Sequence, residues 1–233
     1  MSSVNILSGG AAQGLVGSLR PAFKAQTGFE IAGEFGAVGV MADKLRKGAS
    51  ADIIVLTAAL VAELAVEKLV LATSIADVGL VETALAVRSG DTPAAVKDAA
   101  DLRKALLACD AIYVPDTKAS TAGIHIGNVL QRLGIADEVA ARLRIFPNGA
   151  TAMRELAASE ARRPIGCTQS TEIIGTKGVT LSGALPPGCE LATMYTAGIT
   201  TAAAHPEQAK HLTDLLTGTA QHEQRKRAGF IGA

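Results

Sequence analysis

The chain has 233 residues, which is enough for one α/β domain or for two small lobes that each bury a core. Its 22 Lys and Arg balance 22 Asp and Glu, so its charge gives no reason to expect a nucleic acid or an acidic membrane surface as a partner. Aromatic residues make up only 3% of the chain, which argues against stacking platforms for bases or sugars and leaves a small molecule as the expected partner.

Local patterns indicate neither a metal centre, nor a cofactor, nor a membrane span. The three cysteines have no CxxC spacing, so a structural zinc site is not expected. The most apolar stretch, residues 57–76, is interrupted by Glu63, Glu67 and Lys68 and reads as an ordinary helix with its continuation. The first ten residues, MSSVNILSGG, lack the basic and apolar regions of a secretory signal. We therefore expect a cytoplasmic protein as written, or a periplasmic one if a leader has been removed.

Hydrophobic periodicity predicts strands that alternate with helices along almost the whole chain. The predicted strands cover residues 4–7, 29–35, 52–57, 82–88, 111–115, 164–168 and 190–200. The predicted helices cover residues 11–26, 38–48, 59–67, 98–108, 121–133, 150–159, 206–217 and 220–228. Such alternation is typical of parallel βαβ units, and it predicts an α/β fold whose ligands bind beyond the carboxyl ends of the strands.

Two continuous apolar runs are long enough to cross from one lobe to another. The first is GLVETALAVRSGD, which begins at Gly79, and the second is ELATMYTAGITTAAA, which begins at Glu190. Two crossings predict a first lobe of residues 1–81 plus 200–233 and a second lobe of residues 82–199. The ligand would then bind in an interlobe cleft.

Four of the predicted helices begin in the same way, with small or polar residues at the helix start. The four junctions comprise Ser8, Gly9, Gly10 and Ala11; Gly36, Ala37 and Val38; Ser120, Thr121 and Ala122; and Asn148, Gly149, Ala150 and Thr151. Helix N-termini carry unpaired amide hydrogens and partial positive charge, so converging junctions of this kind can hold a compact anion. The alternative is that these residues only cap their helices.

Several segments resemble the molybdate-binding component of ABC transporters. They are NILSGGAAQGL, GEFGAVGVMADKLRKGASADIIVLTAA, GIHIGNVLQRLGIADEV, PIGCTQSTEI and HPEQAKHLTDLLTG, and they follow the order found in that family. The resemblance covers nearly the whole chain. It implies a two-lobed periplasmic-binding-protein-like fold (type II) with two crossing segments and one small anionic ligand in the interlobe cleft. It also implies an ABC permease as partner if the chain is exported.

The same resemblance implies a change of ligand. Where similar molybdate binders place oxyanion-binding serines, this chain has Ala11 and either Val38 or Ala37, and where they often place a tyrosine it has Gln169. A buried dianion without these hydroxyl donors would lose about 1–3 kcal/mol for each unsatisfied oxygen. A di- or tricarboxylate fits better. Its expected side-chain donors are Ser8, Thr57, Ser120, Thr121, Asn148, Thr151, Thr168 and Gln169, while Ala122 and Gly149 match positions that offer backbone amides.

Three functional hypotheses remain open at this point. The first is a solute receptor, the second an isomerase similar to aconitate isomerase, and the third an intracellular oxyanion sensor. The isomerase reaction is an allylic proton shift, which needs groups that remove and return a proton. His125 and Tyr195 are the candidates, each with a packing role as the alternative. Cys167 has no cationic neighbour in sequence and is expected to be an inert buried thiol.

Overall fold

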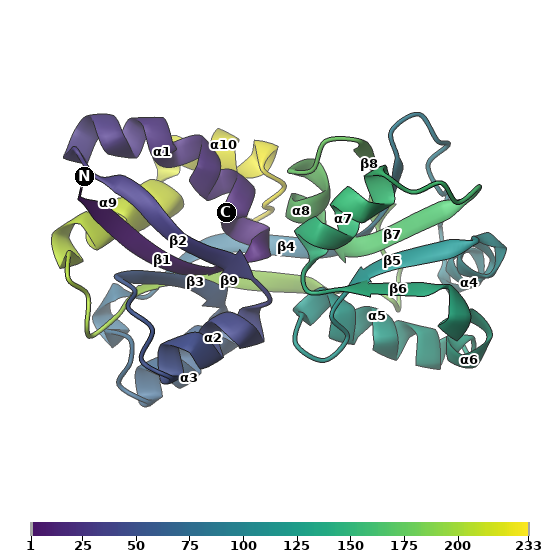
Figure 1. The fold of residues 1–233 in the computed structure, drawn as a ribbon, viewed down its shortest axis with the longest axis horizontal. Coiled ribbons are helices and arrows are strands. Elements are labelled where there is room, and N and C mark those ends of the chain that lie inside the picture. Colours follow the sequence, from purple (N-terminus) through teal and green to yellow (C-terminus); the bar gives the residue numbers. More distant parts are fainter. Residues whose placement is uncertain (1, 233) are drawn as a thin grey trace. The chain divides into compact units, whose positions relative to one another are not determined.

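A computed structural model describes residues 2–232 of the chain, which form two compact units. Unit 1 contains the chain up to Val81 and again from Thr193, and unit 2 contains Glu82–Ala192. Two strands run across the boundaries between them, β4 (Ala76–Arg88) and β9 (Ala192–Ile199). The chain therefore passes between the units twice, in the two segments in which the sequence predicts crossings (Figure 1).

The sheet of unit 1 has the strand order β2-β1-β3-β9-β4. β1 (Ser3–Gly9), β2 (Glu30–Gly36) and β3 (Ile53–Thr57) are parallel, and β9 runs antiparallel to β3. β3 is central and its first four residues are fully buried, which explains why its sequence is a continuous apolar run and not an alternating one.

Helices cover both faces of this sheet. α1 (Gln13–Thr27) packs with α9 (Pro206–Thr217), while α2 (Val38–Arg46) and α3 (Ala58–Val66) cover the opposite face (Figure 1). Short helical segments complete the unit: η1 (Gly10–Ala12), η2 (Ala72–Ser74), η4 (Thr219–Gln221) and α10 (His222–Arg227). α1 ends because Gly28 adopts a left-handed conformation with φ of 75°, which glycine tolerates without strain.

The sheet of unit 2 has the order β8-β4-β7-β5-β6. β5 (Ala111–Pro115), β6 (Leu143–Phe146) and β7 (Pro164–Gln169) are parallel, and β4 runs antiparallel to both β7 and β8 (Val179–Ala184). Each unit thus places the carboxyl ends of three parallel strands at one edge. That edge is where an α/β sheet binds its ligands.

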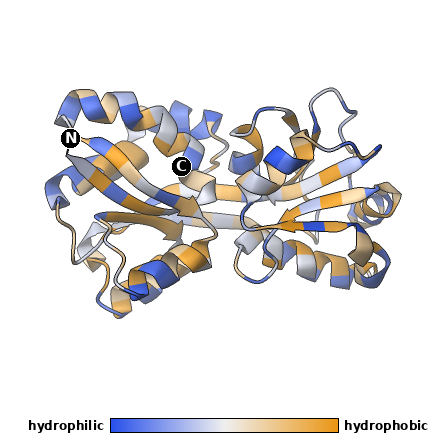
Figure 2. Cartoon of the chain, viewed as in Figure 1, coloured by the Kyte–Doolittle hydropathy of each residue, from blue (hydrophilic) through white to orange (hydrophobic). Residues whose placement is uncertain are grey.

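Two helical layers enclose the unit 2 sheet with separate apolar cores. One core contains buried residues of α4 (Ala99–Ala108), α5 (Thr121–Arg132) and α6 (Ala136–Val139), and the other those of α7 (Gly149–Ala157) and α8 (Ser170–Ile174). η3 (Ala140–Arg142) leads from α6 into β6. The helices of both units alternate hydrophilic and hydrophobic residues along their length (Figure 2), as amphipathic surface helices do.

The structure differs from the sequence prediction at several elements. The strands β6 and β8 and the helices α6 and α8 were not predicted, and β4 begins at Ala76 and not at residue 82. Residues 193–199, which the sequence assigned to the second lobe, belong to unit 1 because β9 pairs with β3 there. The predicted interlobe cleft depends on how the lobes are placed, and it stays a prediction.

Candidate functional site

The first two predicted junctions lie at one edge of the unit 1 sheet. β1 and β2 are parallel and their register pairs Gly9 with Gly36, while Thr57 ends the neighbouring strand β3 at the same edge. A helical segment follows each of these strand ends. The sequence-predicted residues of these junctions are thus brought together within one unit.

Tyr195 packs against the first of these junctions. It pairs with Thr57 in the antiparallel ladder between β3 and β9, and it is 2% exposed. A Cβ atom added to Gly9 would lie 2.9 Å from Tyr195 Cε1 and 2.8 Å from Val38 Cγ1. Both distances are too short for real Cβ contacts, so only glycine fits where β1 ends.

Two hydroxyl groups at this edge have partners within the protein. Ser8 is buried, and its Oγ donates to the carbonyl oxygen of Gly9 at 2.9 Å. Thr57 Oγ1 accepts the amide hydrogen of Leu60 at 3.4 Å and caps α3. Within residues 2–232, no side chain caps η1 or α2, and the flanking residues Gly10, Ala11, Gly36, Ala37 and Val38 carry no hydroxyl. The donors that unit 1 offers here are therefore backbone amides and the hydroxyl hydrogen of Thr57, whose oxygen accepts from Leu60.

The third junction, at the start of α5 in unit 2, also lacks a side-chain cap in the described part of the chain. The loop before it is closed by Asp116, whose Oδ1 accepts the amide hydrogens of Lys118 at 2.7 Å and Ala119 at 2.9 Å. Ser120 and Ala122 are buried and Thr121 is half-buried. The first-turn amides of this twelve-residue helix are left for an acceptor from outside the helix.

The fourth junction, at the start of α7, is satisfied from within the protein. Asn148 Oδ1 accepts the amide hydrogen of Thr151 at 2.8 Å, and the amides of Gly149 and Ala150 donate to the carboxylate of Glu172. All three first-turn amides of α7 therefore have internal partners. A ligand near this junction would have to find its donors in side chains.

Glu172 is a buried carboxyl group that sequence reasoning missed. It lies in α8, is 7% exposed, and also accepts the hydroxyl hydrogen of Thr168 at 2.5 Å and the amide hydrogen of Gln169. Burial raises the pKa of Glu172 above its usual value, although these hydrogen bonds act in the opposite direction. Its position three residues after the N-cap residue of α8 is the sequence signal that could have identified it, since a Glu there reaches back to the N-cap amide.

Gln169 is the least satisfied of the predicted site residues. It ends β7, is 3% exposed, and neither its Nε2 nor its Oε1 has a hydrogen-bond partner in residues 2–232. Thr83 of β4 is its register partner, and the Oγ1 of Thr83 is likewise buried without a partner in that range. Register partners of an antiparallel pair share one face of the sheet, so the two side chains lie next to each other. Thr83 had no distinguishing signal in the sequence.

His125 is held by the backbone of its own unit. Its Nε2–H donates to the carbonyl oxygen of Cys189 at 2.8 Å, and the side chain is half-buried. This bond joins α5 to the segment that precedes β9. Cys167, in contrast, is fully buried, and burial raises the pKa of its thiol to about 12. A thiol with so little thiolate is a poor nucleophile.

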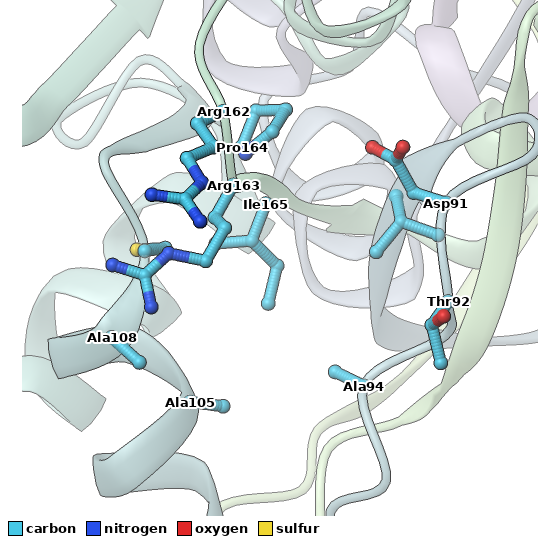
Figure 3. A pocket seen from close by; sticks show the side chains of 11 residues that line it. Asp91, Thr92, Ala94, Ala105, Ala108, Arg162, Arg163, Pro164 and Ile165 are labelled. Atoms are coloured by element: carbon cyan, nitrogen blue, oxygen red, sulfur yellow. The ribbon is translucent and has the colours of Figure 1, made fainter.

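A cavity of about 370 Å³ opens in unit 2 away from these residues (Figure 3). It is lined by the amino end of β7 at Pro164 and Ile165, by Arg162 and Arg163 just before it, and by small residues of α4. None of the predicted site residues lines it. Within residues 2–232, no helix is both long and apolar enough to cross a bilayer, and no three His, Cys, Asp or Glu side chains gather as metal ligands would.

Comparison with known proteins places the chain in a family. The sequence pattern of the family described as bacterial extracellular solute-binding protein matches residues 4–231. The periplasmic molybdate-binding protein of Azotobacter vinelandii superposes with a TM-score of 0.82 at 17% identity, over 98% of this chain and 99% of that one. The sulfate-binding protein SubI of Mycobacterium tuberculosis superposes with a TM-score of 0.75 at 17% identity, over 99% and 86%.

A curated relative is an enzyme. The chain is 23% identical over 227 residues to the aconitate isomerase of a Pseudomonas species, covering 93% of this chain and 82% of that protein. The solved structures confirm the predicted two-lobed fold of type II periplasmic binding proteins, and the resemblance to molybdate-binding proteins is confirmed as well. The chain belongs to the family of bacterial extracellular solute-binding proteins.

Proposed function

We propose that the protein binds a small oxyanion or a di- or tricarboxylate, with a specificity that differs from that of molybdate-binding proteins. The observation that carries the proposal is the buried side-chain amide of Gln169, which lies at the carboxyl end of a parallel strand and has no hydrogen-bond partner among residues 2–232. Buried polar groups are almost always hydrogen-bonded, so an unpartnered one at a strand end marks a place for a ligand. The uncapped start of α5 supplies further donors in the same unit.

The absence of a hydroxyl group at positions 11 and 38 supports a change of ligand. Ala11 and Val38 are 2% and 7% exposed and offer only their backbone amides. A compact tetrahedral dianion needs a donor for each of its oxygens, whereas a larger carboxylate spreads its charge over groups that reach separate donors. We therefore propose carboxylates as the main ligand class. As a receptor, the protein would deliver its ligand to an ABC permease from the periplasmic side.

Thermal unfolding against a ligand panel tests the proposal. The panel contains molybdate, tungstate, sulfate, phosphate, citrate, cis-aconitate and trans-aconitate. A ligand at one hundred times its dissociation constant adds about 2.7 kcal/mol to the free energy of unfolding, so binding is visible as a rise in Tm. We expect carboxylates to raise the Tm of the wild-type protein but not that of Gln169→Leu. Gln131→Leu, at an exposed position of α5, is the control. A rise with molybdate or tungstate alone would contradict the proposal.

A second candidate function, isomerisation of an unsaturated polycarboxylate, is favoured by the similarity to aconitate isomerase. His125 and Tyr195 are the proposed proton-transfer residues. Conversion of cis- to trans-aconitate can be followed by proton NMR in the wild type, in His125→Ala and in Tyr195→Phe. We expect each substitution to slow turnover by roughly 100-fold, in the range of general acid–base catalysis. An active wild type that neither substitution slows would show that other residues transfer the proton.

A further inference from the structure

The side chains around Gln169 carry information about the ligand beyond its charge. Gln169 offers two N–H donors and one carbonyl acceptor, and both of its polar atoms lack a partner in residues 2–232. This mismatch does not depend on which way the amide is turned, because exchanging Nε2 and Oε1 leaves one donor and one acceptor in place. A ligand that only accepts hydrogen bonds would satisfy the nitrogen and leave the carbonyl oxygen unpaired.

Thr83 reinforces the requirement. Its Oγ1 is buried without a hydrogen-bond partner in the described part of the chain, and it faces the same side of the sheet as Gln169, across the β4–β7 ladder. A hydroxyl group adds one donor and two more acceptor positions. The pair therefore presents acceptors that need a hydrogen from the ligand, as well as donors that need an oxygen.

Glu172 explains why the anionic part of a ligand should lie elsewhere. Its carboxylate accepts the backbone amide hydrogens of Gly149 and Ala150 at the start of α7. It also accepts the hydroxyl hydrogen of Thr168 and the backbone amide hydrogen of Gln169. The attraction of the α7 N-terminus for a negative group is thus already used by a residue of the protein. A second negative charge placed beside Glu172 would be repelled when Glu172 is ionised.

Building on the proposed function, we infer that the Gln169–Thr83 subsite binds a hydroxyl group carried by the anionic ligand, and that the protein selects hydroxylated anions over analogues that only accept hydrogen bonds. An O–H group donates to the carbonyl of Gln169 while its oxygen accepts from the amide nitrogen or from Thr83. Hydroxycarboxylates have this chemistry, and so does hydrogen phosphate. Sulfate, molybdate and simple polycarboxylates lack it.

Isothermal titration calorimetry on matched ligand pairs tests this inference. Citrate and tricarballylate differ only in one hydroxyl group, as do malate and succinate, and phosphate against sulfate provides the inorganic pair. A site built to bind a hydroxyl leaves its own polar groups unpaired when the hydroxyl is missing, at a cost of about 1–3 kcal/mol. We expect the hydroxylated member to bind roughly 10- to 100-fold more tightly. The pair that shows the preference identifies whether the ligand class is a hydroxycarboxylate or hydrogen phosphate.

Two variants link the preference to the subsite. Gln169→Met and Thr83→Val keep the volume and remove the polar atoms, and neither breaks an internal hydrogen bond that the described residues make. Both should fold, and without ligand both should be at least as stable as the wild type. We expect Gln169→Met to reduce the preference to less than 3-fold, Thr83→Val to weaken it, and Gln131→Met to leave it unchanged.

The outcomes separate this inference from the proposed function. Equal affinity for both members of every pair would overturn the inference while leaving anion binding intact. The same holds if Gln169→Met keeps the full preference. Failure of every anion to bind would overturn both. A clear loss of stability in ligand-free Gln169→Met would show that the amide serves the fold and would also refute the inference.

Discussion

At the scale of single residues, we expect Glu172 to have the strongest effect on how the free energy of unfolding depends on pH. Its pKa is raised in the folded protein because burial outweighs its hydrogen bonds. The folded state then holds this proton more tightly than the unfolded state, so the contribution of Glu172 to stability falls as pH rises above the usual carboxyl value of 4.5. We predict that the free energy of unfolding of Glu172→Gln falls less steeply between pH 4.5 and pH 8 than that of the wild type.

Urea unfolding at a series of pH values measures this difference. Glu155→Gln, at an exposed position of α7, is the matched control and should follow the wild type. A wild-type stability that rises relative to Glu172→Gln over this range would mean that the hydrogen bonds dominate and that the pKa of Glu172 is lowered.

The cysteines give a second prediction at this scale. All three are buried, and burial raises the pKa of Cys109 to about 11 and that of Cys167 to about 12. Only the thiolate reacts with disulfide reagents, so modification of these two thiols in the native protein at pH 8 should be at least 100-fold slower than in 8 M urea, where all three react. Mass spectrometry of the modified peptides checks this. Rapid labelling of Cys167 in the folded protein would contradict its description as an inert buried thiol.

At the scale of elements, the contact between α7 and α8 depends on Gly149. A Cβ atom at this position would lie 1.9 Å from Glu172 Oε2 and 2.0 Å from Thr168 Oγ1. Gly149→Ala should therefore displace the carboxylate from the helix start and lower the free energy of unfolding by about 1–3 kcal/mol. Gly127→Ala on α5 is the control, because nothing lies within 4 Å of its Cβ position. Equal stability of the two variants would contradict the described packing.

Asp52 joins two elements of unit 1 that are far apart in sequence. It is 2% exposed, and its carboxylate accepts the amide hydrogens of Asn5 in β1 at 2.7 Å and of His205 at the start of α9 at 2.8 Å. Asp52→Ala leaves both backbone amides without their acceptor, so we predict that the free energy of unfolding falls by about 2–4 kcal/mol, measured by chemical unfolding. Asp43→Ala, at an exposed position of α2, should change stability by less than about 0.5 kcal/mol.

Some elements of the fold could be predicted from the sequence and others could not. The buried strand β3 and the helix starts at residues 38, 121 and 149 to 150 were predictable because apolar runs and small residues mark them locally. β6 and β8 were not, since both have mostly exposed or half-exposed residues and so lack the apolar pattern of a central strand. The residues that lie next to Gly149 and Gln169 could not be predicted from the sequence either. They come from α8 and β7 for Gly149 and from β4 for Gln169, and only tertiary structure brings these elements together.

At the scale of the whole molecule, the sequence predicted the family and the fold more securely than the ligand. The fold follows from the order of strands and helices, which residues 4–231 share with the family. Ligand choice depends on a few donors and acceptors. Thr83 stands outside the motifs that carry the resemblance, and Glu172, although it lies within PIGCTQSTEI, is brought to the start of α7 only by the tertiary structure. Relatives of this fold bind molybdate or sulfate, and one sequence relative is an isomerase, so the fold alone does not determine the ligand.

Competition calorimetry tests the central claim most directly. Citrate and molybdate are each titrated into the ligand-free protein, and each is then titrated into protein saturated with the other. We predict that citrate binds at one site per chain and that molybdate neither binds nor weakens citrate binding. One-to-one binding of molybdate that competes with citrate would contradict the account, because it would show that the same site accepts an inorganic oxyanion although Ala11 and Val38 carry no hydroxyl group.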